Sequence, residues 1–158
     1  MNQFTFQEQN AKQEHKDGVN LCLKYLQEQG MSARDVSNNS DYFKLGVDIL
    51  VEAPDGEYTI DVKTDEQMWQ TQNIVAELME ICSFDKVKIG WVYKKLDAIY
   101  YLNWKTKELY TLPLGEFKKI IFSKSRKSFS AYHPSPIQYF TLGVLVPIEE
   151  LEEYKKQL

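Results

Sequence analysis

Apolar residues near the start of the chain recur at three- and four-residue intervals, as on one face of a helix: Val19, Cys22, Leu23 and Leu26. The pattern predicts a helix over residues 4–29, which Gly30 ends because glycine commonly follows the last turn. A short strand over 33–37 is expected next. Residues 38–41 are polar and predict a loop.

The pattern changes in the next stretch from a helical period to alternation. Residues 46–52 read as a strand, residues 54–56 (Pro-Asp-Gly) as a turn, and residues 57–64 as a second strand. Alternation places Asp61 and Lys63 on the same face of the second strand. These two segments predict an antiparallel hairpin.

The remaining pattern completes an alternation of helices and strands. In chain order we expect a helix over 70–82, strands over 87–93, 98–102 and 107–111, a helix over 114–122, a loop over 123–136, a strand over 139–146 and a helix over 147–156. A hairpin among such elements predicts an α/β fold, in which helices flank a central mixed β-sheet. With 158 residues, the chain has the length of a single domain, 1–158.

Composition narrows the class of protein. Hydrophobic residues make up 43% of the chain and aromatic residues 13%, which is enough for a core and excludes global disorder. The apolar runs are too short to span a membrane, and the N-terminus has no signal-peptide pattern. Cys22 and Cys82 lie in apolar contexts typical of free, buried thiols. Together these features predict a cytoplasmic protein without a membrane partner.

Charge is distributed unevenly along the chain. Residues 1–85 carry 16 acidic and 6 basic side chains, whereas residues 86–148 carry 3 acidic and 11 basic ones. The basic half includes a cluster close in sequence: Lys118, Lys119, Lys124, Arg126 and Lys127. This cluster is a candidate nucleic-acid-binding surface, since cationic patches attract phosphate backbones. An ordinary solvated surface is the competing interpretation.

Three charged side chains converge on the predicted hairpin. If Asp55 and Gly56 form a two-residue loop, Asp48 lies opposite Lys63, and Asp61 is its diagonal neighbour on the same face. Two carboxylates this close repel each other unless a cation lies between them, and a hard divalent ion such as Mg²⁺ prefers oxygen ligands. The simpler alternative is a solvated hairpin with a cross-strand salt bridge.

The same residues carry a resemblance to a known family. Asp48, followed after twelve residues by Asp61-Val62-Lys63, on two hairpin strands behind an N-terminal helix, resembles the PD-(D/E)XK nuclease superfamily, in particular its small phage-type or mobile-element members. Val47 stands where many members have proline. The resemblance implies a restriction-endonuclease-like three-layer fold. It also implies that Asp48, Asp61 and the Val62 carbonyl bind Mg²⁺ or Mn²⁺, and that Lys63 orients the attacking water.

The resemblance further implies supporting residues outside the hairpin. Many members use an acidic residue of the first helix to complete the metal shell, and here the candidates are Glu14, which we favour, and Asp17. Asn73 and Glu77 are candidate accessory residues on the helix expected over 70–82. An exposed, solvated helix face is the alternative for each of them.

These features predict a metal-dependent nuclease that hydrolyses DNA phosphodiester bonds. DNA is the expected partner, and the resemblance adds the expectation of a homodimer. The alternative is a catalytically inactive module that keeps the nuclease fold for DNA binding or for protein interaction.

Overall fold

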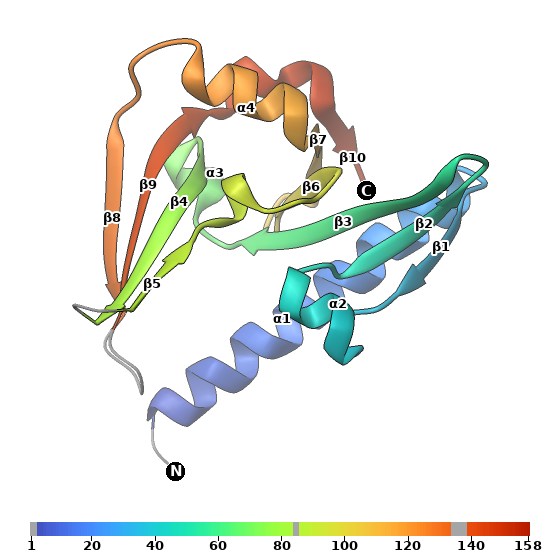
Figure 1. Ribbon diagram of the computed structural model, residues 1–158, viewed down its shortest axis with the longest axis horizontal. Helices are drawn as coiled ribbons and strands as arrows, with labels where there is room; N and C mark the ends of the chain where they lie inside the picture. The colour runs from blue at the N-terminus through green and yellow to red at the C-terminus, as the bar shows by residue number, and fades with distance from the viewer. Residues whose placement is uncertain (1–2, 84–85, 134–138) are drawn as a thin grey trace.

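The computed structural model describes residues 3–83, 86–133 and 139–158, and the side chains of residues 11–82, 86–132 and 139–158. The described chain forms two sheets (Figure 1). The six-stranded sheet has the order β1-β2-β3-β6-β7-β10, with bounds Ser32–Asp35, Ile49–Ala53, Gly56–Asp65, Ala98–Asn103, Glu108–Pro113 and Lys155–Gln157. The four-stranded sheet has the order β5-β4-β9-β8, with bounds Lys86–Ile89, Asn73–Ser83, Tyr139–Pro147 and Ser128–His133.

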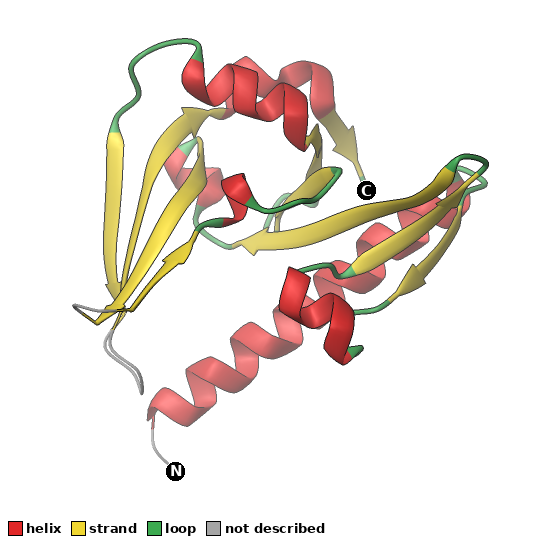
Figure 2. Ribbon diagram, viewed as in Figure 1, coloured by secondary structure: helices red, strands yellow, loops and turns green. Residues whose placement is uncertain are grey.

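The six-stranded sheet is mixed, because β3 and β6 run parallel while its other neighbouring strands pair antiparallel. Helices lie on both of its sides (Figure 2). They are α1 (Gln3–Glu28), α2 (Ser40–Leu45), α3 (Met68–Thr71) and α4 (Leu114–Phe122), with 3₁₀ turns η1 (Trp91–Tyr93) and η2 (Ile148–Tyr154). The expected α/β class, with a central mixed sheet flanked by helices, is therefore confirmed.

Alternation along β6 shows how the layers are built. Ala98, Tyr100 and Leu102 belong to the core cluster that α1 covers with Val19, Cys22 and Leu26. Ile99 and Tyr101 face the opposite way, into a second cluster with α4 and the four-stranded sheet. Each face of the strand thus has its own core, as expected for a sheet buried on both sides.

The predicted helix over 70–82 is wrong, because this segment forms the strand β4. Ile74, Leu78 and Ile81 have spacing that suits a helix stripe, but Ile74 and Ala76 are both fully buried, with the period of a strand. β4 pairs antiparallel with β5 on one side and with β9 on the other. These two pairings satisfy its backbone and override the helix propensity of its Glu, Leu and Met residues.

Other boundaries also differ from the prediction. The expected loop at 38–41 contains the start of α2, where the Asn39 side chain accepts a hydrogen bond from the Asp41 backbone N–H at 3.0 Å. The expected loop over 123–136 contains β8, which pairs with β9, and residues 134–136 lie outside the described part. In place of the strand expected over 87–93, the strand β5 ends at Ile89, and η1 follows from Trp91.

The C-terminal segment is a 3₁₀ helix, η2, followed by β10, rather than the α-helix expected over 147–156. β10 adds to the edge of the six-stranded sheet by pairing with β7. The predictions for α1, the hairpin strands, β6 and α4 are confirmed. No helix in the described ranges is both long and apolar enough to cross a lipid bilayer.

Candidate active site

The hairpin that carries the predicted site has a different loop from the one expected. Ala53 pairs with Gly56, so the two-residue loop consists of Pro54 and Asp55. Gly56 has φ 142°, a backbone conformation that favours glycine, and it therefore begins the return strand. The register is shifted by two residues from the prediction, and the expected pairing of Asp48 with Lys63 is wrong.

The shift leaves Asp48 beside Asp61 because it is an even number of residues. The Asp48 backbone N–H donates to the Ile60 carbonyl at 2.9 Å, and Asp48 Oδ2 accepts a hydrogen bond from the Val62 N–H at 2.8 Å. Asp48 is thus fixed between the two residues that flank Asp61. The structure brings together the three charged groups that the sequence pattern selected.

Asp61 is the most buried of these groups, with 2% of its surface exposed. Its Oδ1 forms an ion pair with Lys63 Nζ at a distance of 2.8 Å. Its Oδ2 is buried and has no hydrogen-bond partner among the described residues. Burial raises the pKa of Asp61 above its ordinary value, although the charge of Lys63 opposes the shift. A buried carboxylate oxygen without a partner is costly unless a cation satisfies it.

Lys63 keeps its charge despite its position. Burial acts to lower the pKa of Lys63, but the charge and hydrogen bond of Asp61 outweigh burial, so the pKa lies above its ordinary value. The side chain remains 32% exposed and therefore reaches solvent. Lys63 can donate further hydrogen bonds to a molecule that enters the site, since an ammonium has three donors.

Helix α1 contributes His15 to the site, which the sequence analysis did not select. His15 Nε2 lies 3.3 Å from Asp48 Oδ1. For Asp48, burial acts to raise the pKa, but the hydrogen bonds from His15 and Val62 and the charges of His15 and Lys63 lower it below its ordinary value. Contact with Asp48 in turn raises the pKa of His15. The helical stripe through Val19 and Cys22 extends back to His15, so the sequence did contain its signal.

The predicted acidic residues of α1 have other partners. Burial, followed by a hydrogen bond with Glu66, raises the pKa of Glu14, and Lys107 opposes this shift. Asp17 accepts a hydrogen bond from Gln13 Nε2 at 2.8 Å. Among the described side chains of α1, His15 contacts Asp48, and metal binding by Glu14 stays a prediction.

Glu77 of β4 and Lys94, which lies between η1 and β6, complete the charged cluster. Burial, then the charge of Glu80, raises the pKa of Glu77, while Lys63 and Lys94 lower it. Lys94 Nζ lies 3.9 Å from Asp61 Oδ2, whereas Lys63 Nζ contacts the other oxygen of this carboxylate, Oδ1. Glu77 was a predicted accessory residue and lies near the site. Lys94 was not predicted, because its spacing carries no motif.

An open cleft of about 930 Å³ leads to the cluster. Glu77 and Lys94 line it, together with the exposed Phe43 of α2. Four lysines line the same cleft: Lys44, Lys88, Lys94 and Lys95. A second hollow of about 550 Å³ is lined by His15, Asp48 and again Phe43. The site is therefore open from two sides.

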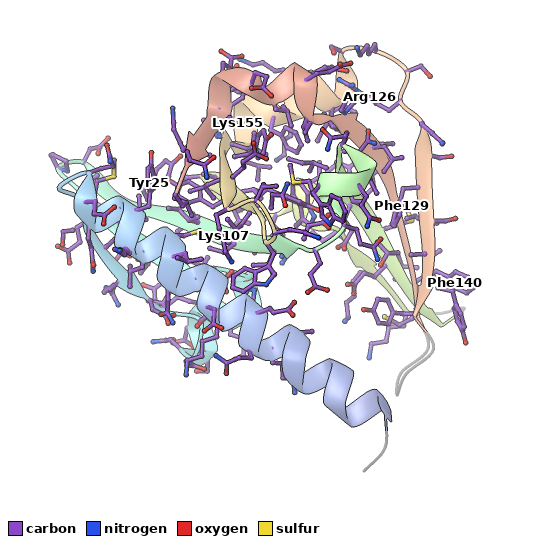
Figure 3. All side chains as sticks on the ribbon, turned by 180° about the vertical axis from the view of Figure 1, so that it is seen from behind. Tyr25, Lys107, Arg126, Phe129, Phe140 and Lys155 are labelled. Carbon is purple, nitrogen blue, oxygen red and sulfur yellow. The ribbon has the colours of Figure 1, made fainter. Side chains whose placement is uncertain are left out.

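The basic cluster predicted over 118–127 lies elsewhere. Figure 1 shows the α4–β8 connection at the top of the molecule, whereas α2 and the start of β2 lie below the middle. Arg126, labelled in Figure 3, donates to both carboxylate oxygens of Glu150 at 2.7 and 2.8 Å and to the Ile120 carbonyl at 2.6 Å. Lys124 pairs with Glu150 at 2.9 Å, and Lys119 pairs with Glu116 at 2.7 Å.

The predicted accessory residue Asn73 belongs to that second region. It lines a hollow of about 440 Å³ together with Lys124 and Lys127, and its side chain donates to the Thr71 carbonyl. Ion pairs of Lys118 and Lys127 are absent from the part of the chain that the structure describes. DNA binding by this cluster stays a prediction. The Arg126 guanidinium already makes hydrogen bonds within the protein.

The donor set at the hairpin suits a hard cation. Asp48 and Asp61 supply carboxylate oxygens, and Asp61 Oδ2 is a buried acceptor with no hydrogen-bond partner in the described part of the chain. Among described side chains, no group of three or more His, Cys, Asp and Glu residues is arranged to hold a metal ion. A metal at this position would therefore be held by two carboxylates together with backbone oxygen or water, which is an arrangement that Mg²⁺ commonly uses.

Comparison with known proteins gives a result for the fold. No protein-family model matches the chain. A search of curated proteins also finds no match. Among solved structures, the chain is similar to a bacterial homing endonuclease, I-Ssp6803I, with a TM-score of 0.52 and 10% sequence identity over 82% of this chain and 76% of that chain. At this identity the likeness concerns the fold, and the chain has a nuclease-like α/β fold.

Proposed function

We propose that the protein is a metal-dependent nuclease of the PD-(D/E)XK type that hydrolyses DNA phosphodiester bonds. The observation that carries the proposal is the buried Asp61 Oδ2, which has no hydrogen-bond partner among the described residues. It lies beside Asp48 and Lys63 and 3.9 Å from Lys94, which lines an open cleft. The similarity of the fold to that of a homing endonuclease supports the same class of chemistry.

In this proposal Asp48 and Asp61 hold Mg²⁺ or Mn²⁺, and the Val62 carbonyl is a further candidate ligand. Glu14 remains the predicted additional ligand from α1. A divalent cation at such carboxylates supplies positive charge to a phosphodiester and makes a water molecule more acidic. His15 and the Val62 N–H keep Asp48 in position by contacting its two oxygens.

Lys63 is the proposed catalytic lysine. One of its donors is engaged by Asp61 at 2.8 Å, and its exposed part leaves further donors for the attacking water and for the charge that develops on the phosphate. Lysines that line the cleft are the proposed contacts to the DNA backbone. A homodimer and a cytoplasmic location stay predictions.

The test is cleavage of single-stranded, double-stranded and branched DNA with Mg²⁺, with Mn²⁺ and with EDTA. We expect cleavage only with metal, and a loss of about 10³-fold or more in Asp61→Asn, because removing one central charge-stabilising group typically costs that much. Asp55→Asn is the matched control, since Asp55 lies exposed in the turn of the same hairpin. Unchanged cleavage by Asp61→Asn, or no cleavage of any substrate by the wild type, overturns the proposal.

Two observations favour a second candidate, a DNA-binding module without turnover. Lys63 and Lys94 already neutralise Asp61, and the described residues hold no group of three ligating side chains. This candidate predicts a mobility shift of DNA in EDTA and no heat of Mn²⁺ binding in calorimetry. Mn²⁺ binding that disappears in Asp48→Ala supports the nuclease instead.

A further inference from the structure

The unused oxygen of Asp61 faces a lysine that is close but not bonded. Lys94 Nζ lies 3.9 Å from Asp61 Oδ2, which is beyond hydrogen-bond distance. The Lys94 ammonium therefore compensates the charge of Asp61 without using its own donors on that oxygen. Lys94 also lines the open cleft, with 30% of its side chain exposed. One side chain thus connects the cleft to the most buried carboxylate.

Gly46 provides the space for this connection. It follows α2 with φ 71°, and its N–H donates to the Phe43 carbonyl at 3.0 Å. A Cβ at this position would overlap the Lys94 ammonium and lie 3.2 Å from Cε and 3.3 Å from Cδ. The Lys94 chain therefore passes directly over the Gly46 backbone. The other end is also fixed, because the Lys94 backbone N–H donates to the Trp91 carbonyl at 3.1 Å.

The charge of the cluster indicates what Lys94 would do. The cluster holds three carboxyl groups (Asp48, Asp61 and Glu77) and two ammonium groups (Lys63 and Lys94), with the His15 imidazole against Asp48. A divalent cation at the carboxylates would add two positive charges, and an entering phosphodiester would bring one negative charge to the same place. The ammonium of Lys94 gains more from an entering phosphate than from a carboxylate that a cation has neutralised.

We infer that Lys94 is a DNA phosphate-binding residue, which serves as the counter-ion of Asp61 in the free protein and contacts a backbone phosphate when the site holds a divalent cation. The inference rests on the proposed function and adds a residue that the hairpin motif does not contain. It predicts that Lys94 contributes to DNA affinity mainly in the presence of a divalent cation. Lys95, the neighbouring lysine, lines the same cleft, and we expect no such dependence for it.

The experiment measures the affinity for a labelled DNA duplex by fluorescence anisotropy, in EDTA and in Ca²⁺, for the wild type, Lys94→Gln and Lys95→Gln. We expect Lys94→Gln to weaken binding about 10-fold in Ca²⁺, as for a lost charge-assisted hydrogen bond, and far less in EDTA. Lys95→Gln should weaken binding about twofold in both conditions, as for a screened surface contact. Lys94→Arg keeps the charge and should recover most of the loss.

Gly46→Ala is a second variant that keeps every charge. Its Cβ displaces the Lys94 side chain, so it should reproduce the loss of affinity in Ca²⁺. Because alanine at φ 71° also strains the end of α2, the free energy of unfolding of this variant is measured alongside its DNA affinity. Equal effects of Lys94→Gln and Lys95→Gln in both conditions overturn the inference. If the wild type nevertheless cleaves DNA, the proposed function stands without it. A wild type that neither binds nor cleaves DNA overturns both.

Discussion

Two charged regions of the molecule differ in how completely their charges are paired. In the segment 118–127, Arg126 makes two hydrogen bonds to Glu150 and a third to a backbone carbonyl. Its Nε is buried without a hydrogen-bond partner among the described residues, but both oxygens of the Glu150 carboxylate are bonded. At the hairpin, Asp61 has one bonded oxygen and one buried oxygen that lies 3.9 Å from Lys94 and has no hydrogen-bond partner among the described residues. A carboxylate with both oxygens bonded stabilises a fold, whereas one with an unsatisfied buried oxygen beside an open cleft is typical of a functional site.

The comparison also shows that charge density along the sequence is a poor guide to a binding surface. The segment 118–127 has the denser run of basic residues, yet several of them pair with Glu116 and Glu150. The cleft lysines are dispersed along the chain, and the fold gathers them between α2, β4, β5 and η1. Of these, Lys88 pairs with Glu80 at 3.5 Å and Lys94 lies 3.9 Å from Asp61. The predictions below test this distinction between the two regions.

The largest expected effect is on cleavage. Lys63→Met should lower the cleavage rate by about 10³-fold, because it removes the donor next to the reacting phosphate. Lys24→Met is the matched control, since Lys24 makes an exposed pair with Glu28 at 3.7 Å on the distant end of α1. Single-turnover cleavage of a DNA substrate measures both. A Lys63→Met rate equal to that of the control would remove the lysine from the mechanism.

The next effect is on stability, in the other region. Arg126→Met should lower the free energy of unfolding by about 3 kcal/mol, because it leaves a carboxylate without its bidentate partner. Lys127→Met should change the free energy of unfolding by less than about 0.5 kcal/mol, as for an exposed residue. Urea denaturation followed by circular dichroism measures both. Equal stabilities of the two variants would show that the Arg126 pair is not structural.

The pH dependence of this pair follows from Glu150. Hydrogen bonds from Arg126 and Lys124 lower the pKa of Glu150 to about 2 from its ordinary 4.5. A lowered folded-state pKa stabilises the protein above the unfolded pKa, and this contribution is lost as pH falls from 4.5 towards 2. The urea midpoints of wild type and Glu150→Gln should therefore differ at pH 6 and converge near pH 2. A constant difference would contradict the assignment.

The smallest effect compares the two regions in DNA affinity. Lys44→Gln combined with Lys88→Gln should weaken binding about fivefold and reduce the slope of affinity against salt by up to about two counterions. Lys118→Gln combined with Lys127→Gln is the matched pair from the sequence-predicted cluster. Anisotropy titrations over a range of salt concentrations measure both pairs. A larger loss for the second pair would return DNA binding to the 118–127 segment.

Local rules predicted much of the site. The stripe of Val19, Cys22 and Leu26 predicted α1, and strand alternation on either side of a short turn brought Asp48, Asp61 and Lys63 together. The predicted register was off by two residues, but an even shift preserves the face of each side chain. These features depend on neighbours a few residues apart, so the amino-acid sequence alone determines them.

Contacts between distant segments decided the rest. The spacing of Ile74, Leu78 and Ile81 fits a helix, and pairing with β5 and β9 nevertheless selected the strand. Parallel pairing of β3 with β6 carries Lys94 to Asp61, and the return of η2 carries Glu150 to Arg126. Such contacts depend on how the whole chain buries its apolar surface and saturates its backbone, and no local spacing encodes that choice.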